Sequence, residues 1–332
     1  MIKHLLIISA LTLSIGACKK QGCTNETATN YNEKATKDDG SCEYPATNAY
    51  AVPSTYSFTD GNGNSTVSFF GQTDRLSQLD EMNAYAESGT TSAITSQMLK
   101  DMFSNSNNPF SFVSSKQLKD KCFGPDVAMV EGLFVKIANA SQVSSQTASS
   151  GQAGTLSSGS STYLFDENGF DCAEMIEKSV MGAVFMNQAL NVYFGPDKMN
   201  VDNATAVNAS ASEYYTTMEH HWDEAFGYFG VPTDFPTTAA TQFWGKYCNS
   251  QDSTLGCNEL MMSNFLKGRA AISNKVYADR DQSINTIRTT WENISANQAI
   301  SYMDKAISFY GTDNAKFLHV LTEAYAFSYN LR

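Results

Sequence analysis

From about residue 74 to the end of the chain, apolar side chains recur at the three- and four-residue spacing of α-helices. In 258–275 they share one face, and 292–308 carries a stripe of small and apolar residues that would let a second helix approach. Segment 171–194 is apolar nearly all round, which predicts a central helix. The pattern predicts a mainly α fold, a helical bundle with helices at 75–87, 91–104, 126–140, 171–194, 209–229, 258–275, 281–308 and 314–332.

Two segments depart from the helical pattern. Residues 54–71 alternate apolar and polar side chains around a turn at 60–63, which predicts a short β-hairpin near the N-terminus of the helical domain. Residues 141–162 are rich in Ser, Gly and Gln and poor in apolar side chains. Such a composition buries little surface, so we expect a flexible Ser-rich loop inside the bundle.

The composition fits one large folded domain preceded by a tail. The chain has 332 residues, of which 42% are hydrophobic, and this excludes wholesale disorder. Its formal net charge of −12 argues against nucleic acid as a partner, because phosphate binding requires a basic surface.

The first residues have the layout of a secretory signal. One lysine precedes the apolar run 5–13, which is too short to span a bilayer. The segment then ends in Ile-Gly-Ala at 15–17 followed by Cys18, which resembles the lipobox of bacterial lipoproteins. The resemblance implies a cleaved signal peptide, 1–17, lipidation of Cys18 and attachment to a membrane through the acyl chains. Because Lys19 and not Asp follows, it also implies the outer membrane, at its periplasmic face or at the cell surface.

Export places the other six of the seven cysteines in an oxidising compartment, where cysteines are expected to pair. Pairing in sequence order predicts three disulfides, Cys23–Cys42, Cys122–Cys172 and Cys248–Cys257. Each closes a plausible loop, and the last closes a short polar loop at 249–256. It is one of several pairings. Catalytic or metal-binding thiols are the alternative, although the chain has no Cys-x-x-Cys spacing.

Residues 18–48 form a tether with a small acidic segment between two cysteines. The stretch 22–42 resembles a small repeat of exported bacterial proteins that is similar to thrombospondin type 3 repeats, which bind calcium through Asp and Asn oxygens. The resemblance implies a calcium site in residues 23–42, with Asn30, Asn32, Asp38 and Asp39 as the available oxygen donors. The alternative is a disulfide-closed spacer that lifts the main domain off the membrane.

Histidine is scarce, so each one is a candidate for chemistry. The chain has four, and His4 lies in the predicted signal. His221 and Glu224 are three residues apart at the edge of the apolar face of one predicted helix, so their side chains can converge on one point. An imidazole nitrogen with a carboxylate oxygen suits a transition metal ion such as iron or zinc. A histidine hydrogen-bonded to a carboxylate, without metal, fits the spacing equally well.

A second pair lies in the last predicted helix, where His319 and Glu323 are four residues apart. Because two ligands do not hold a metal alone, this pair is a candidate to complete a site with His221 and Glu224 inside the bundle. The apolar residues of this helix lie on the opposite face, so His319 and Glu323 facing solvent is the alternative.

The segments 177–182, 221–224 and 319–327 resemble a bacterial lipoprotein family of unknown function that is distantly similar to the imelysins, the M75 peptidase-like family. The resemblance covers about residues 49–332. It implies an imelysin-like helical domain in the envelope with a metal-binding Gly-x-His-x-x-Glu motif. His221 and Glu224 match that motif, but Glu219 stands where the family has glycine.

The candidate functions therefore differ in class. The first is an envelope-anchored lipoprotein that binds a metal ion or a metal-bearing ligand through His221 and Glu224. The second is a surface module that binds an envelope or extracellular polymer or protein without metal, through some of its 16 Tyr and 20 Phe side chains. An enzyme is not indicated, because a zinc peptidase needs a third ligand and a general base and the chain has no His-Glu-x-x-His motif.

Overall fold

The computed structural model describes residues 20–26, 28–43 and 50–331. The chain divides into two compact units, 1–50 and 51–332. The predicted signal peptide and the lipidated Cys18 lie outside the described residues. In the part of the chain that is described, no helix is both long enough and apolar enough to cross a membrane.

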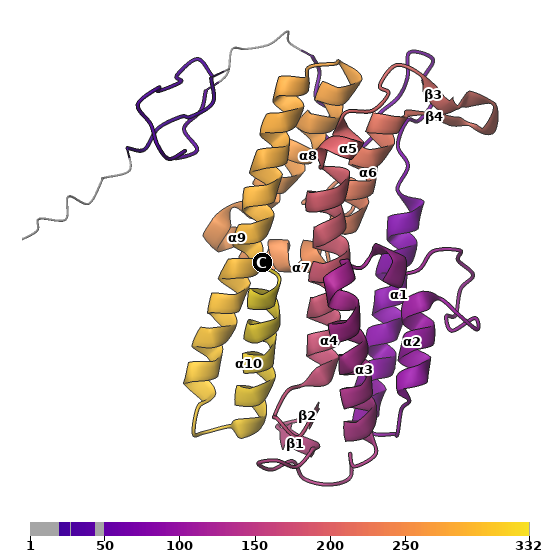
Figure 1. The fold of residues 1–332 in the computed structure, drawn as a ribbon, viewed down its shortest axis with the longest axis vertical. Coiled ribbons are helices and arrows are strands. Elements are labelled where there is room, and N and C mark those ends of the chain that lie inside the picture. Colours follow the sequence, from indigo (N-terminus) through magenta and orange to yellow (C-terminus); the bar gives the residue numbers. More distant parts are fainter. Residues whose placement is uncertain (1–19, 27, 44–49, 332) are drawn as a thin grey trace, which may run out of the picture. The chain divides into compact units, whose positions relative to one another are not determined.

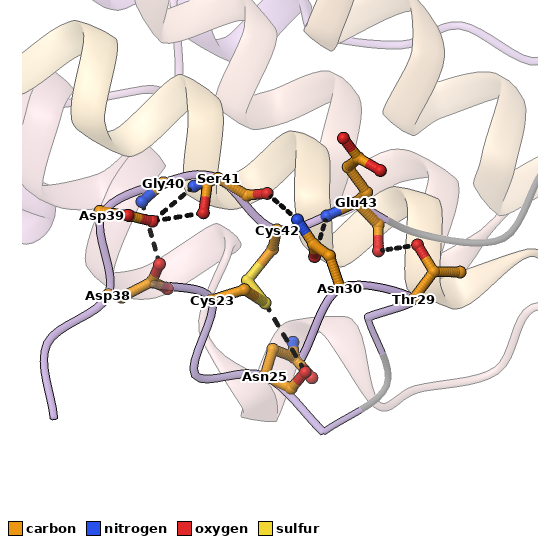
Figure 2. Close-up of a disulfide and its surroundings, with 10 residues drawn as sticks. All are labelled: Cys23, Asn25, Thr29, Asn30, Asp38, Asp39, Gly40, Ser41, Cys42 and Glu43. Carbon is orange, nitrogen blue, oxygen red and sulfur yellow. Dashed lines mark hydrogen bonds between the residues drawn. A yellow bond between two sulfur atoms is a disulfide. The ribbon is translucent and has the colours of Figure 1, made fainter. Parts of the chain in front are cut away.

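The described part of the first unit is a small loop closed by a disulfide. Cys23 is bonded to Cys42, as the sequence predicted (Figure 2). The amide side chain of Asn30 bridges the backbone of Ser41 and Glu43, and Asn32 accepts a hydrogen bond from the backbone N–H of Lys34. The carboxylates of Asp38 and Asp39 likewise accept backbone N–H groups, from Gly40 and Ser41. All four predicted calcium donors therefore form hydrogen bonds within this loop, and calcium binding stays a prediction.

The second unit is mainly helical, as the apolar pattern predicted (Figure 1). Its helices are α1 Phe70–Glu87, α2 Ser96–Ser104, α3 Val127–Ser141, α4 Cys172–Val180, α5 Pro196–Met199, α6 Thr217–Phe229, α7 Phe243–Leu255, α8 Cys257–Ser273, α9 Tyr277–Phe309 and α10 Asn314–Tyr329. Two π-helical stretches, Met181–Met186 and Gln188–Tyr193, continue α4. The continued helix lies centrally and is buried nearly all round, as its sequence indicated.

Helix α6 shows why the local sequence folds in this way. Thr216 caps its first turn and Glu219 returns a hydrogen bond to the Thr216 N–H, while Gly230 ends the helix with a left-handed φ of 75°. The Trp222 and Phe226 side chains are fully buried. Helix α8 accommodates the Trp222 ring at Gly268, where a β-carbon would lie 2.1 Å from the indole.

The helix predictions needed two corrections. The segment expected to be a polar loop between Cys248 and Cys257 is the second half of α7 and its C-terminal cap, and only Gly256 separates α7 from α8. The expected helix at 209–229 begins later, at Thr217, because strand β4 (Glu213–Thr216) pairs with β3 (Ala206–Asn208) first.

The β-structure differs in place from the prediction. The expected hairpin at 54–71 is reduced to one antiparallel bridge, Thr59–Ser65. Backbone groups of this segment form hydrogen bonds with side chains of helices instead of with a second strand. The N–H of Ser68 donates to Asp223, and the carbonyl of Thr66 accepts from Arg269. Conversely, the Ser-rich segment expected to be a flexible loop contributes strand β1 (Gly154–Ser158) and the start of β2 (Ser161–Phe165), which pair antiparallel.

The other two predicted disulfides are not formed. The backbone N–H of Phe123 donates to the carbonyl of Ala183, eleven residues beyond Cys172 and so roughly 15 Å further along the helical stack. Cys122 therefore lies well away from Cys172, and both are buried thiols, so their predicted pairing is wrong. Cys248 and Cys257 are neighbouring thiols in the structure, and the Cys257 Sγ lies 3.1 Å from the Cys248 carbonyl oxygen.

Candidate metal centre

Helix α10 buries the face opposite to the one that the sequence predicted to be buried. Leu321 and Tyr325 are 40% and 48% exposed, whereas Thr322 and Glu323 are 2% and 5% exposed. The polar face that carries His319 therefore packs against α4, beside which α10 lies in Figure 1. His319 and Glu323 thus do not face bulk solvent.

The start of α4 supplies the partners of His319. Asp171 precedes the first residue of α4, and Glu174 lies in its first turn. The backbone N–H of Asp171 donates to the Thr322 hydroxyl, which ties the start of α4 to α10. His319 Nδ1 lies 2.9 Å from Asp171 Oδ2. One ligand atom from each of Asp171, Glu174 and His319 lies within 4.8 Å of the other two.

A pocket of about 300 Å³ opens on this cluster. The Tyr163 ring of β2 stacks on the His319 imidazole with centroids 4.2 Å apart, and Glu87 of α1 lies on the pocket wall. The side chain of His319 is 18% exposed, so the cluster is neither sealed in the core nor open on the surface. A small ion can reach it, and the surrounding protein limits its hydration.

Behind the cluster lies Lys178, the main positive charge near these acids. Its side chain is 3% exposed, and its ammonium contacts Glu174, lies 3.0 Å from Glu177 and lies 3.6 Å from Glu323. Four carboxylates, including Asp171, thus surround one lysine and one histidine. This surplus of negative charge favours a cation or bound protons.

The pKa shifts of Asp171, Glu323 and His319 agree with this surplus. In contrast, although burial opposes the shift, Lys178 keeps the pKa of Glu174 low. Burial raises the pKa of Asp171 although His319 donates toward it, and burial raises the pKa of Glu323 to about 7 although Lys178 opposes the shift. Burial disfavours the imidazolium of His319, but the hydrogen bond and charge of Asp171 outweigh it and raise the His319 pKa. Both members of the Asp171–His319 pair therefore retain a proton more readily than usual, and a metal ion would displace that proton.

The other predicted pair lies elsewhere in the bundle. His221 Nδ1 is 3.2 Å from Glu224 Oε2, so the two side chains converge as their spacing predicted. The second Glu224 oxygen accepts from Tyr193 and Gln72, and this pair shares no partner with His319. In Figure 1, α6 lies in the upper half of the bundle and α10 in the lower half. The predicted joint site of His221, Glu224, His319 and Glu323 is therefore wrong.

Within the described residues, one group of three His, Cys, Asp or Glu side chains converges: Asp171, Glu174 and His319. One imidazole nitrogen and two carboxylate oxygens form a donor set suited to zinc, iron or manganese. The sequence predicted His319 and its neighbour Glu323, whose Oε2 lies 3.7 Å from His319 Nε2, but not Asp171 and Glu174. Asp171 and Glu174 have the three-residue spacing of His221 and Glu224, and that spacing at a helix start was the available signal.

Fold and site together define a helical-bundle protein with a buried carboxylate–histidine cluster. The chain belongs to a domain family of unknown function, DUF4856, whose family model matches residues 53–332. Comparison with curated proteins and with solved structures gave no match.

Proposed function

We propose that this protein binds a divalent transition metal ion, such as iron or zinc, at Asp171, Glu174 and His319. The observation that carries the proposal is the convergence of three ligand atoms within 4.8 Å at the edge of a pocket. The surplus of buried carboxylates around Lys178 supports it, because a bound cation would offset their repulsion.

The proposal retains the cell envelope as the location of the protein. It places the metal site at Asp171, Glu174 and His319 instead of at His221 and Glu224. The lipobox resemblance around Cys18 supports a lipid-anchored outer-membrane protein, and the imelysin resemblance supports metal binding. Within the described residues, no third metal-binding side chain converges with His221 and Glu224, and Glu224 is already held by Tyr193 and Gln72. We therefore assign this pair a structural role.

The proposal is tested by measuring metal affinity in the chain and in two histidine variants. We expect Zn²⁺, Mn²⁺ or Fe²⁺ to bind with a one-to-one stoichiometry in calorimetry. His319→Ala leaves two carboxylates, so we expect binding about tenfold weaker. His221→Ala is the matched control and is expected to bind as tightly as the unchanged chain. Absence of metal binding to the unchanged chain rejects the proposal. A loss of metal binding in H221A alone would place the site at His221 and Glu224 of α6.

A second candidate, an interaction module, has one observation in its favour. Of the stripe in 292–308 that was expected to receive another helix, Ala299 is buried, whereas Ile300, Met303 and Ile307 are 58%, 45% and 73% exposed. Tyr310, the residue after α9, is 74% exposed beside them in the sequence. An apolar stripe of this kind is typical of a contact surface, and a second copy of the chain is the simplest partner.

This rival predicts concentration-dependent dimers in light scattering. Ile307→Glu places a charge in the middle of the stripe and is expected to leave monomers at every concentration tested. Val113→Glu, at a fully exposed apolar position outside α9, is the control and should still dimerise. Monomers in all three proteins would remove self-association from the candidates.

A further inference from the structure

A second and larger cavity lies further along the continued α4. Its volume is about 610 Å³, within the range of small-molecule pockets. One wall is the π-helical segment 181–193, the opposite wall is α9, and the end of α10 closes the third side. No residue of this lining belongs to the Asp171, Glu174 and His319 cluster.

The π-helical wall is an independent sign of function. A π-turn is less favourable than an α-turn and is found frequently at functional sites. Here two such stretches follow one another, and Gly182 and Asn191 from them, with Asn187 between the stretches, line the cavity. Gly182 lets the Asn330 amide approach, since a β-carbon there would lie 1.9 Å from Asn330 Oδ1.

Opposite charges face the cavity from one wall. Arg288 and Glu292 lie one turn apart on α9, a spacing at which such residues usually pair. Arg288 instead donates to the Asn191 side chain and the Leu190 carbonyl, and these contacts fix its guanidinium against the π-helical wall. Within the described residues, Glu292 forms no ion pair. The cavity therefore presents a positive and a negative group that do not neutralise each other.

Neutral polar groups and an apolar floor complete the cavity. Asn330 Oδ1 is buried without a hydrogen-bond partner in the described residues, and Asn187 uses its Oδ1 to accept from Asn191, which leaves its N–H₂ group as a donor. An unpaired acceptor and donor of this kind match the N–H and C=O of a peptide bond. Phe123, Met186 and Leu190 provide apolar surface for a side chain.

We propose that this cavity binds a small zwitterion of the amino-acid or dipeptide class. The ligand carboxylate contacts Arg288, its ammonium contacts Glu292, and its apolar side chain lies on Phe123 and Met186. A polyanion does not fit, because Asp126 and Glu292 add negative charge to the same lining. A neutral sugar does not fit either, because it carries no charged group that could pair with Arg288 or Glu292.

The test uses three forms of one ligand, leucylalanine, its C-terminal amide and its N-acetyl derivative, in calorimetry with the full chain. The unchanged chain is expected to bind the zwitterion about tenfold more tightly than either blocked form, because each block removes one charge-assisted hydrogen bond. Arg288→Gln should remove the preference for the free carboxylate alone, and Glu292→Gln the preference for the free ammonium alone. Asp304→Asn, an exposed change on α9 outside the cavity, should alter neither.

The paired changes separate recognition from damage to the fold. A variant that merely loosens the cavity weakens all three ligands together, so loss of all three in both variants would overturn the proposal. Equal binding of the zwitterion and the blocked forms, or binding of a neutral sugar in their place, would also overturn it.

Discussion

Replacing Arg269 by Met is expected to lower the free energy of unfolding by about 3–5 kcal/mol, which is the usual effect of removing one partner from a buried ion pair. The Arg269 side chain is fully buried. Its Nε donates to Asp223 at 2.9 Å, one terminal nitrogen to Glu219 at 2.7 Å and the other to the Thr66 carbonyl at 2.9 Å. One side chain thus joins α8, α6 and the segment before α1.

The pH dependence of the loss of stability in Arg269→Met provides a second measurement. Burial raises the pKa of Asp223 although Arg269 opposes it, and Arg269 keeps the pKa of Glu219 low although burial opposes that. Without the guanidinium, both carboxyl groups have folded-state pKa values above their unfolded values. Such groups destabilise the fold as the pH rises. We therefore expect a larger deficit at pH 8 than at pH 5 in urea denaturation.

Arg280→Met is the matched control. Arg280 is also buried, at 6% exposure, but it pairs with Asp281, whose side chain is 58% exposed and remains solvated when the partner is lost. We expect a smaller loss of stability in R280M, with little dependence on pH. Equal losses in the two variants would show that packing of the arginine stem, and not the buried charges, is what matters at Arg269.

The sequence predicted the helical class and the central helix because both depend on local periodicity. It misplaced β-structure where backbone groups bond distant elements, as at Thr66 and Ser68. It also read the polar stretch before Cys257 as a loop, although Gln251 of α7 is 9% exposed and bonds Gln298 of α9. Such tertiary contacts override the local structural preference, and the local composition does not reveal them.

The candidate site shows the same limit. An apolar face predicts the buried side of a helix only when polar residues have no buried partners, and on α10 they have several. Thr322 binds the backbone of Asp171, and Glu323 lies beside Lys178. These polar side chains are therefore buried together with Ala326 and Phe327. His319 could be named from the scarcity of histidine and Glu323 from its spacing, whereas Asp171 and Glu174 lie more than a hundred residues earlier in the chain.

Replacing Lys178 by Met is expected to tighten metal binding by roughly 10- to 100-fold, if Asp171, Glu174 and His319 are the ligands. The ammonium contacts the same Glu174 carboxylate that the ion would share. Although burial opposes its charge, Glu174 and the neighbouring acids raise the pKa of Lys178, so it stays protonated and repels a second cation. Methionine keeps the length and packing of the side chain and removes that repulsion.

The same change should destabilise the metal-free protein, because Glu174, Glu177 and Glu323 lose their counter-charge. The rise in melting temperature on adding Zn²⁺ is therefore expected to be larger in K178M than in the unchanged chain, since tighter binding to the folded state stabilises it more. Lys119→Met, which removes an exposed ion pair with Glu131, is the control and should change neither quantity. Weaker binding in K178M would mean that Lys178 positions Glu174 for the ion. Binding in neither protein would reject the metal site itself, because a cluster freed of its lysine has no competing cation left.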